Sequence, residues 1–239
     1  MARERYLVGV PKEELAYHPP QQPQTPKSRW NNFWYYHKWA VLGVAALAAV
    51  LTLMIVQAAT RVKPDYLICM VTRQGVSQKL IEQLQTELAV CGSDRNHDGD
   101  VVVQIQCLDI SADNPQAVQT ANNQAILGHM ASKDVHLYFF DPSYYTETVC
   151  GAMRGGALFF EKLGVSAAGV SDDNTYWNWE NAAFFEKDIF KNAASWEKLP
   201  SSMVCGVRAA DDKLYSAKEK EEHQACLALL RTFVASQTV

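Results

Sequence analysis

The segment with the clearest chemical pattern is DRNHDGD, which covers residues 94–100. It places side-chain oxygens at its first, third and fifth positions and a glycine at its sixth, the pattern by which EF-hand-like loops surround calcium. Calcium is therefore the one cofactor that the sequence suggests. The candidate ligands are Asp94, Asn96, Asp98 and, through its backbone carbonyl, Asp100.

The same segment also fits a turn between two elements of secondary structure. Calcium loops carry a bidentate glutamate at position twelve, where this chain has Ile105, and isoleucine offers no side-chain oxygen. Asp, Asn and Gly also recur in plain turns, where they form local hydrogen bonds and adopt positive φ. We therefore keep two interpretations, a turn or a calcium site of weak affinity with a stabilising role.

Two groups of aromatic and polar residues are candidates for binding a ligand. The first lies in the polar segment 171–181, and the second follows an apolar run that ends at residue 140. Rings beside amides could stack on a sugar or cap a cleft, and the alternative is that they fill the edge of a core. The candidate ligand-binding residues are Asp141, Tyr144, Tyr145, Tyr176, Trp177 and Trp179.

No arrangement typical of catalysis occurs in the sequence. The six histidines are scattered without an HExxH motif, and neither GxSxG nor a glycine-rich phosphate loop after a strand is present. The cysteines form no CxxC pair, which argues against a structural zinc site. We therefore expect a protein that is not an enzyme, and we assign no catalytic residue.

These candidates need a scaffold, and the hydrophobic pattern of the second part of the chain predicts one. Apolar runs rich in strand-forming residues cover 65–72, 100–110 and 134–140, and amphipathic helices are expected over 76–92 and 114–130. This β-α-β-α-β order predicts an α/β fold with three layers, in which helices pack on a mostly parallel sheet.

The carboxyl ends of parallel strands are where open α/β sheets bind ligands. This rule places residues 72–75 and 141–143 together at one edge of the expected sheet. The pattern then weakens, because Gly155 and Gly156 interrupt a partly helical stretch. A last strand over 201–209 and a helix over 216–236, capped by Ser216, complete the expected domain, which covers 65–239.

Residues 39–60 form an apolar run with no charged residue. A bilayer core of about 30 Å needs about 20 such residues in a helix, so the run predicts a single transmembrane helix. We expect an uncleaved signal-anchor. The alternatives are a cleavable signal peptide, which the long preceding segment disfavours, and a buried soluble helix, which would need a polar stripe.

The chain before this helix is expected to have two parts. Residues 1–28 are polar and rich in proline, which predicts a disordered tail. Residues 29–38 form an aromatic juxtamembrane segment whose rings suit the headgroup layer of the lipid bilayer. The candidate membrane-interface residues are Trp30, Phe33, Trp34, Tyr35, Tyr36, Lys38 and Trp39.

Charge and cysteine usage bear on the location of the two parts. The segment before the helix has six basic and three acidic residues, and the rest of the chain has 16 basic and 23 acidic residues. The basic tail predicts a cytoplasmic N-terminus and an extracellular C-terminal domain in the cell membrane. The acidic domain makes nucleic acid an unsuitable partner. All six cysteines follow the helix, and free buried thiols and disulfides both remain open.

The segment PKSRWNNFWYYHKWAVLGVAAL, residues 26–47, resembles the start of uncharacterised single-pass membrane proteins of Gram-positive bacteria that carry an NFWYYHKW-type juxtamembrane segment. HLYFFDPSYY, residues 136–145, resembles the strand-and-aspartate step of a type 2 periplasmic-binding-protein-like lobe. The resemblance implies a solute-binding-like α/β ectodomain and no established activity. The part after the helix is short for two complete lobes, and closure around a ligand needs two.

The leading hypothesis is a membrane-tethered extracellular domain that binds a small solute or an envelope protein. The alternative is a structural or assembly component of a cell-envelope complex with no small-molecule ligand. An exposed pocket favours the first hypothesis, and a filled cleft beside an exposed apolar patch favours the second.

Overall fold

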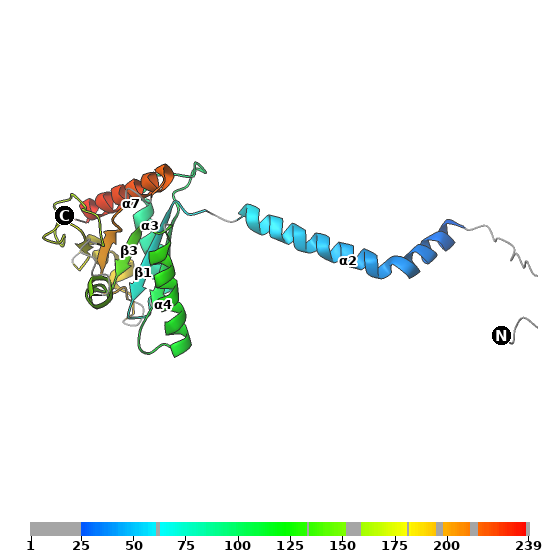
Figure 1. Cartoon of the computed structure of the whole chain (residues 1–239), viewed down its shortest axis with the longest axis horizontal. Helices are drawn as coiled ribbons and strands as arrows, with labels where there is room; N and C mark the ends of the chain where they lie inside the picture. Colours follow the sequence, from blue (N-terminus) through cyan, green and yellow to red (C-terminus); the bar gives the residue numbers. More distant parts are fainter. Residues whose placement is uncertain are drawn as a thin grey trace, which may run out of the picture. The chain divides into compact units, whose positions relative to one another are not determined.

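The computed structural model describes residues 25–60, 63–132, 134–151, 159–180, 182–194, 198–210 and 215–237. The chain forms two compact units, Met1–Val62 and Lys63–Val239 (Figure 1). The expected anchor helix lies in the first unit, and the expected domain 65–239 lies in the second. The predicted disordered tail lies almost entirely outside the described residues.

The first unit contains one long helix, α2 (Pro26–Thr60). Among the described residues, it is the one helix that is long and apolar enough to cross a membrane, and none of its apolar window is buried by protein. The helix starts well before the predicted residue 39, so the aromatic segment is a continuation of it. At about 1.5 Å per residue, its length exceeds that of a hydrocarbon core by several turns.

Aromatic rings cluster on the first turns of α2. Trp30 stacks on Phe33 and Trp34, with ring centroids 6.1 and 6.4 Å apart, and Tyr35 meets Tyr36 edge to face. All the predicted interface rings are exposed in the isolated chain. Exposed rings at one end of an apolar helix suit a membrane interface, which remains a prediction for these residues.

The second unit is built on a five-stranded sheet of order β2-β1-β3-β5-β4. Strand β1 lies between β2 and β3, and it pairs with both in parallel. The α/β prediction is therefore confirmed. The strands are β1 (Tyr66–Thr72), β2 (Val103–Asp109), β3 (Leu137–Phe140), β4 (Trp177–Asn178) and β5 (Val204–Val207).

The prediction of a mostly parallel sheet holds for β1, β2 and β3 only. Strand β5 pairs antiparallel with both β3 and β4, so the sheet is mixed. A parallel neighbour requires a crossover over the sheet face, usually through a helix. In the described part of the chain between β4 and β5, the elements are the short 3-10 helix η3 (Ala183–Glu186) and helix α6 (Asp188–Lys191), and the chain returns in the opposite direction.

Helices cover both faces of the sheet, as the three-layer prediction requires. Helices α3 (Gln78–Ala89) and α7 (Ala217–Ser236) bury their apolar sides in one core cluster, together with Ile68 and Met70 of β1. Helix α4 (Gln116–Ala131) contributes to a second cluster, which holds the alternate β1 residues Cys69 and Val71. Side chains point alternately to the two faces of a strand, so these clusters lie on opposite faces.

The ends of the elements follow local chemistry. Ser216 and Glu219 form a capping box at the start of α7, which confirms the predicted cap. The partly helical stretch after β3 begins with α5 (Pro142–Tyr144) and the π-helix η2 (Tyr145–Cys150). In β5, a Cβ atom at Gly206 would lie 2.5 Å from the ring of Phe160, so only glycine allows this ring to pack across the strand.

Candidate functional site

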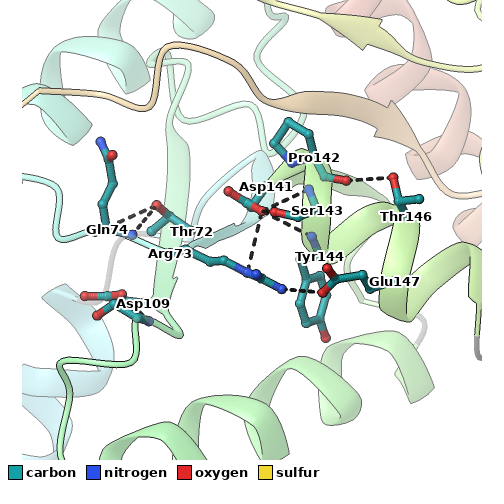
Figure 2. Close-up of polar contacts among 11 residues, drawn as sticks. Thr72, Arg73, Gln74, Asp109, Asp141, Pro142, Ser143, Tyr144, Thr146 and Glu147 are labelled. Carbon is teal, nitrogen blue, oxygen red and sulfur yellow. Dashed lines mark hydrogen bonds and ion pairs between the residues drawn. The ribbon is translucent and has the colours of Figure 1, made fainter.

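The carboxyl ends of β1, β2 and β3 meet at one edge of the sheet, which we call the carboxyl edge. It comprises residues 72–75 at the end of β1, 109–114 at the end of β2 and 141–143 directly after β3. From β1 the chain runs through α3 to β2 on one side of β1, and it then returns through α4 to β3 on the other side. The connections that leave β1 and enter β3 therefore diverge between these two strands. Open α/β sheets bind ligands at such a switch point. The predicted placement of 72–75 beside 141–143 is confirmed (Figure 2).

Arg73 connects the two sides of the switch point. Its Nη2 atom donates to Glu147 Oε2 at 2.7 Å, and its Nε atom lies 3.7 Å from Asp141 Oδ1 (Figure 2). The loop around it is fixed by Thr72, whose hydroxyl donates to the carbonyl of Gln74 and accepts from the Gln74 N–H. The guanidinium therefore holds the loop after β1 against the helical segment after β3.

Asp141 acts as the cap of that helical segment. Its Oδ1 atom accepts hydrogen bonds from the Ser143 N–H at 3.0 Å, the Tyr144 N–H at 3.1 Å and the Ser143 hydroxyl at 2.6 Å. One carboxylate oxygen is thus committed to the turn. The structure places Asp141 at the carboxyl edge as predicted, where it shapes the rim of the switch point.

A polar cavity of about 390 Å³ lies beside Arg73, between the segments that follow β1 and β2. Asp109 lines this cavity, and its Oδ1 atom accepts a hydrogen bond from the Ser111 N–H at 2.8 Å. The Asp109 backbone carbonyl accepts from the side-chain amides of Asn114 and Asn122, which fixes the start of α4. The cavity is lined by Arg73, Gln74, Gly75, Asp109, Ser111, Asp113 and Asn114.

The predicted aromatic ligand residues do not form one site. Trp177 and Trp179 are 2% and 0% exposed, and their indole N–H groups donate to the carbonyls of Ala168 and Pro200. Both rings belong to the core cluster under α3 and α7, so the alternative that rings fill the core describes them. They are buried because β4 joins their segment to the sheet by pairing with β5. The polar residues that surround them in the chain gave no sign of this burial.

The tyrosines lie on the other face of the sheet. Tyr144 is 7% exposed and packs on Phe140, and Tyr145 meets Tyr176 edge to face at 5.5 Å. Burial raises the pKa of Tyr144. A second cavity of about 350 Å³ is bordered by Tyr176 and Trp177, away from the carboxyl edge residues. The predicted ligand residues are therefore distributed over three places.

The segment 94–100 folds as a tight loop that bonds to itself. Asp94 accepts from the His97 N–H at 2.7 Å and the Gly99 N–H at 2.9 Å, and Asn96 and Asp98 accept from the N–H groups two residues on. The Gly99 N–H is the main cause of the lowered pKa of Asp94. His97 and Gly99 have φ values of 60° and 97°, which Asn-rich and Gly-rich turns tolerate.

Buried Asp65, which precedes the loop in the sequence, holds it in place by accepting hydrogen bonds from backbone N–H groups. The sequence did not predict this role. The Oδ1 atom of Asp65 accepts from the Arg95 N–H at 2.8 Å and the Asn96 N–H at 3.0 Å, and its Oδ2 atom accepts from the Val102 N–H at 2.8 Å. The loop is thus a structured turn. Among the described residues, no group of three or more His, Cys, Asp or Glu side chains is placed to hold a metal ion.

All six cysteines are free thiols. Cys69, Cys205 and Cys226 are buried, and burial raises the pKa of Cys69 and of Cys226 to about 12. Cys150, at the end of η2, is exposed. Of the two alternatives that the sequence left open, the structure has free thiols.

Arg73 lies in the segment 72–75 that the sequence placed at this edge, but neither Arg73 nor Asp109 was predicted as a site residue. Arg73 directly follows the predicted strand 65–72 and Asp109 lies near the end of the predicted strand 100–110, so the rule that parallel strands end at one edge was the signal that could have found them. Comparison with protein-family models, with curated proteins and with solved structures gave no match.

Proposed function

We propose that this protein is a membrane-tethered binding domain that holds a small polar solute at the carboxyl edge. The observation that carries the proposal is the cavity of about 390 Å³ at the ends of β1 and β2, beside the switch point. Its volume suits a small ligand, and its position is the usual one for ligands of α/β sheets. The candidate membrane helix α2 supports the tether.

The lining groups indicate the class of solute. Asp109 and Asp113 supply carboxylates, whereas Arg73, Gln74 and Asn114 supply donors from a guanidinium and two amides. Paired acceptors and donors of this kind bind several hydroxyl groups, or a hydroxyl and an amine, better than an apolar molecule. Sugars and amino acids fit this description. The proposed topology keeps the N-terminus cytoplasmic and the domain extracellular, in line with the basic tail.

The test is a thermal-shift panel on the full chain in detergent micelles, with sugars, amino acids and short peptides as probes. A solute present at about 100 times its dissociation constant adds about 2.7 kcal/mol, which raises the melting temperature by several degrees. A solute that binds the proposed site raises the melting temperature of the natural chain and does not raise that of the Asp109→Asn variant. A flat panel, or a shift that Asp109→Asn retains, overturns the proposal.

Asp172→Asn is the matched control, because Asp172 is exposed and borders the second cavity of about 350 Å³. If the carboxyl edge binds the solute, Asp172→Asn shows the same rise in melting temperature as the natural chain. If Asp172→Asn removes the response and Asp109→Asn does not, the second cavity is the binding site. The competing hypothesis, an assembly component with no small ligand, predicts a flat panel for all three chains.

A further inference from the structure

Arg73 is the basic residue among the described residues that line the cavity of about 390 Å³, which we call the carboxyl-edge cavity. Its Nη2 atom donates to Glu147 Oε2 at 2.7 Å, and its Nε atom lies 3.7 Å from Asp141 Oδ1 (Figure 2). Two carboxylates of the protein therefore already neutralise the guanidinium, which leaves little positive charge for an anionic solute. Arg73 acts on the cavity by holding the loop that carries Gln74 and Gly75.

The side-chain amides of the lining are also engaged. Gln74 Nε2 donates to the Lys198 carbonyl at 3.0 Å, and Asn114 Nδ2 donates to the Asp109 carbonyl at 3.2 Å. These hydrogen bonds fix the orientation of both amides. Because part of the donor capacity of each amide is used inside the protein, the lining offers a solute few donors.

Acceptor atoms of the lining are left open. Among the described residues, Asp109 Oδ2 accepts no hydrogen bond, although Oδ1 accepts the Ser111 N–H. The carboxylate of exposed Asp113 has no hydrogen bond or ion pair within the described part of the chain. The carboxyl-edge cavity therefore presents two carboxylates as acceptors to a molecule that enters it.

Gly75 keeps one of these acceptors accessible. Its φ is not positive, so the backbone does not require glycine at this position. The nearest heavy atom outside residues 74–76 that a Cβ atom here would meet is Asp109 Oδ2, at 3.9 Å. A longer side chain at residue 75 would crowd this oxygen, and glycine leaves the space beside it to a solute.

We propose that the solute bound at the carboxyl edge is an organic amine, held through its ammonium group by Asp109 and Asp113. An ammonium group has three donors and no acceptor, so it matches a lining whose acceptors are open and whose donors are engaged. Its hydrogen bonds to carboxylates are about twice as strong as neutral ones. The inference rests on the proposed function, and it narrows the class of solute to amino sugars and basic amino acids.

Charge near the cavity also favours a cation over an anion. Arg73, its two carboxylate partners and the two lining aspartates carry a net charge of −3. Helices α3 and α4 begin at this edge, and the amino end of each contributes about half a positive charge. The potential therefore stays negative after both helices are counted. Calcium, the alternative cation, takes about six to eight oxygen ligands, and the cavity of about 390 Å³ has room for a larger molecule.

The test is a thermal-shift experiment on the full chain in detergent micelles, followed by titration with each probe that binds. Glucosamine is compared with glucose and N-acetylglucosamine, and lysine with its diacetyl derivative, so that the members of a set differ in the ammonium group. We expect the amine of a set to raise the melting temperature and the neutral members not to raise it. Asp109→Asn and Asp113→Asn should each weaken binding at least about tenfold, because each removes a carboxylate partner of the ammonium group.

Asp134→Asn is the matched control, because Asp134 is exposed and precedes β3, at the opposite end of the strand from the carboxyl edge. This variant should bind the amine as the natural chain does. Gly75→Leu should abolish binding, because its side chain occupies the space beside Asp109 Oδ2. Circular dichroism confirms that each chain is folded. If Asp109→Asn is unfolded, Asp113→Asn and Gly75→Leu decide, since both positions are exposed.

Failure of this inference is distinguishable from failure of the proposed function. A neutral solute that raises the melting temperature as much as its amine, and does so no longer in Asp109→Asn, overturns the inference and leaves the proposed function standing. A response to calcium chloride alone that Asp109→Asn removes overturns the inference in favour of a metal ion. A flat panel, or an amine response that persists in both aspartate variants, overturns the inference and the proposed function together.

Discussion

His136 and His223 pack edge to face inside the second unit, with ring centroids 5.7 Å apart and side chains 2% and 1% exposed. Nε2 of His223 lies 2.8 Å from the Arg208 carbonyl, whereas both ring nitrogens of His136 and Nδ1 of His223 have no hydrogen-bond partner. Burial, and then the neighbouring His223 and Arg208, lower the pKa of His136 to about 4. The folded protein therefore favours the neutral form of His136.

Acid should destabilise the domain through His136. Its pKa of about 4 in the folded state is lower than the ordinary value of 6.5, so the unfolded chain binds the proton more tightly. This stability is fully present above pH 6.5 and is lost as the pH falls towards 4, at a cost of at most about 3 kcal/mol. Urea unfolding between pH 7.5 and 4.5 measures it. His136→Phe should flatten this dependence, whereas His129→Gln should preserve it.

Replacement of Asp65 should unfold the loop 94–100 and weaken the domain. Its carboxylate accepts three backbone N–H groups in a buried position, so Asp65→Asn should cost about 3 kcal/mol in the free energy of unfolding. Asp98→Asn is the matched control, because exposed Asp98 accepts one bond from the Asp100 N–H, and it should cost less than about 1 kcal/mol. Equal losses in the two variants would contradict the anchoring role.

Calcium separates the two interpretations of the loop 94–100. Both oxygens of Asp94 already accept backbone N–H groups, so we expect the turn interpretation to hold. The melting temperature should then be the same, within about 1 °C, in millimolar calcium chloride and in chelator. A rise in calcium that disappears in Asp94→Asn and Asp98→Asn would instead establish the metal site, with Asp172→Asn as the control.

Arg73→Gln should change ligand binding far more than stability. The ion pairs of Arg73 with Asp141 and Glu147 are partly exposed to solvent, and such pairs contribute less than about 1 kcal/mol. Urea unfolding should therefore show little change, while any solute found by the thermal-shift panel should bind more weakly. A large loss of stability would show that Arg73 has a structural role at the switch point.

Thiol reactivity should follow burial. In native protein, a thiol reagent such as DTNB should react rapidly with Cys150, because it is exposed and three of the other thiols are buried. Cys150→Ser should remove this rapid phase. Denatured protein prepared without reductant should titrate six thiols. A lower count in the denatured state would mean that disulfides form in the native chain.

The longer strands and helices of the second unit could be predicted because each has a local signal, whereas the short elements β4, η3 and α6 were not predicted. The apolar run at 65–72 became β1, and the amphipathic pattern at 216–236 became α7 with Ser216 as its cap. The direction of β5 could not be predicted, since an apolar run indicates a strand and not its orientation. Helix α2 begins before residue 39 because the aromatic residues that precede the expected membrane segment do not end a helix.

The candidate site could be predicted only in part. The switch point followed from the order of elements, so Asp141 was named correctly as a residue of the carboxyl edge. For Trp177 and Trp179 the sequence left open a ligand cleft and a core, because a polar segment does not show which of its rings turn inward, and the core interpretation holds. Asp65 was missed because its N–H partners lie at least 30 residues away in the sequence.

The position of β1 decides how the second unit responds to mechanical force. β1 is the first strand after α2, and it pairs with β2 along seven residues and with β3 along four. Tension on a tether would thus enter the sheet at its central parallel strand. When a partner holds a neighbouring strand, the hydrogen bonds on both sides of β1 are loaded in shear and must break together. A tethered domain with this connectivity resists pulling better than one tethered through an edge strand, which would unzip one bond at a time.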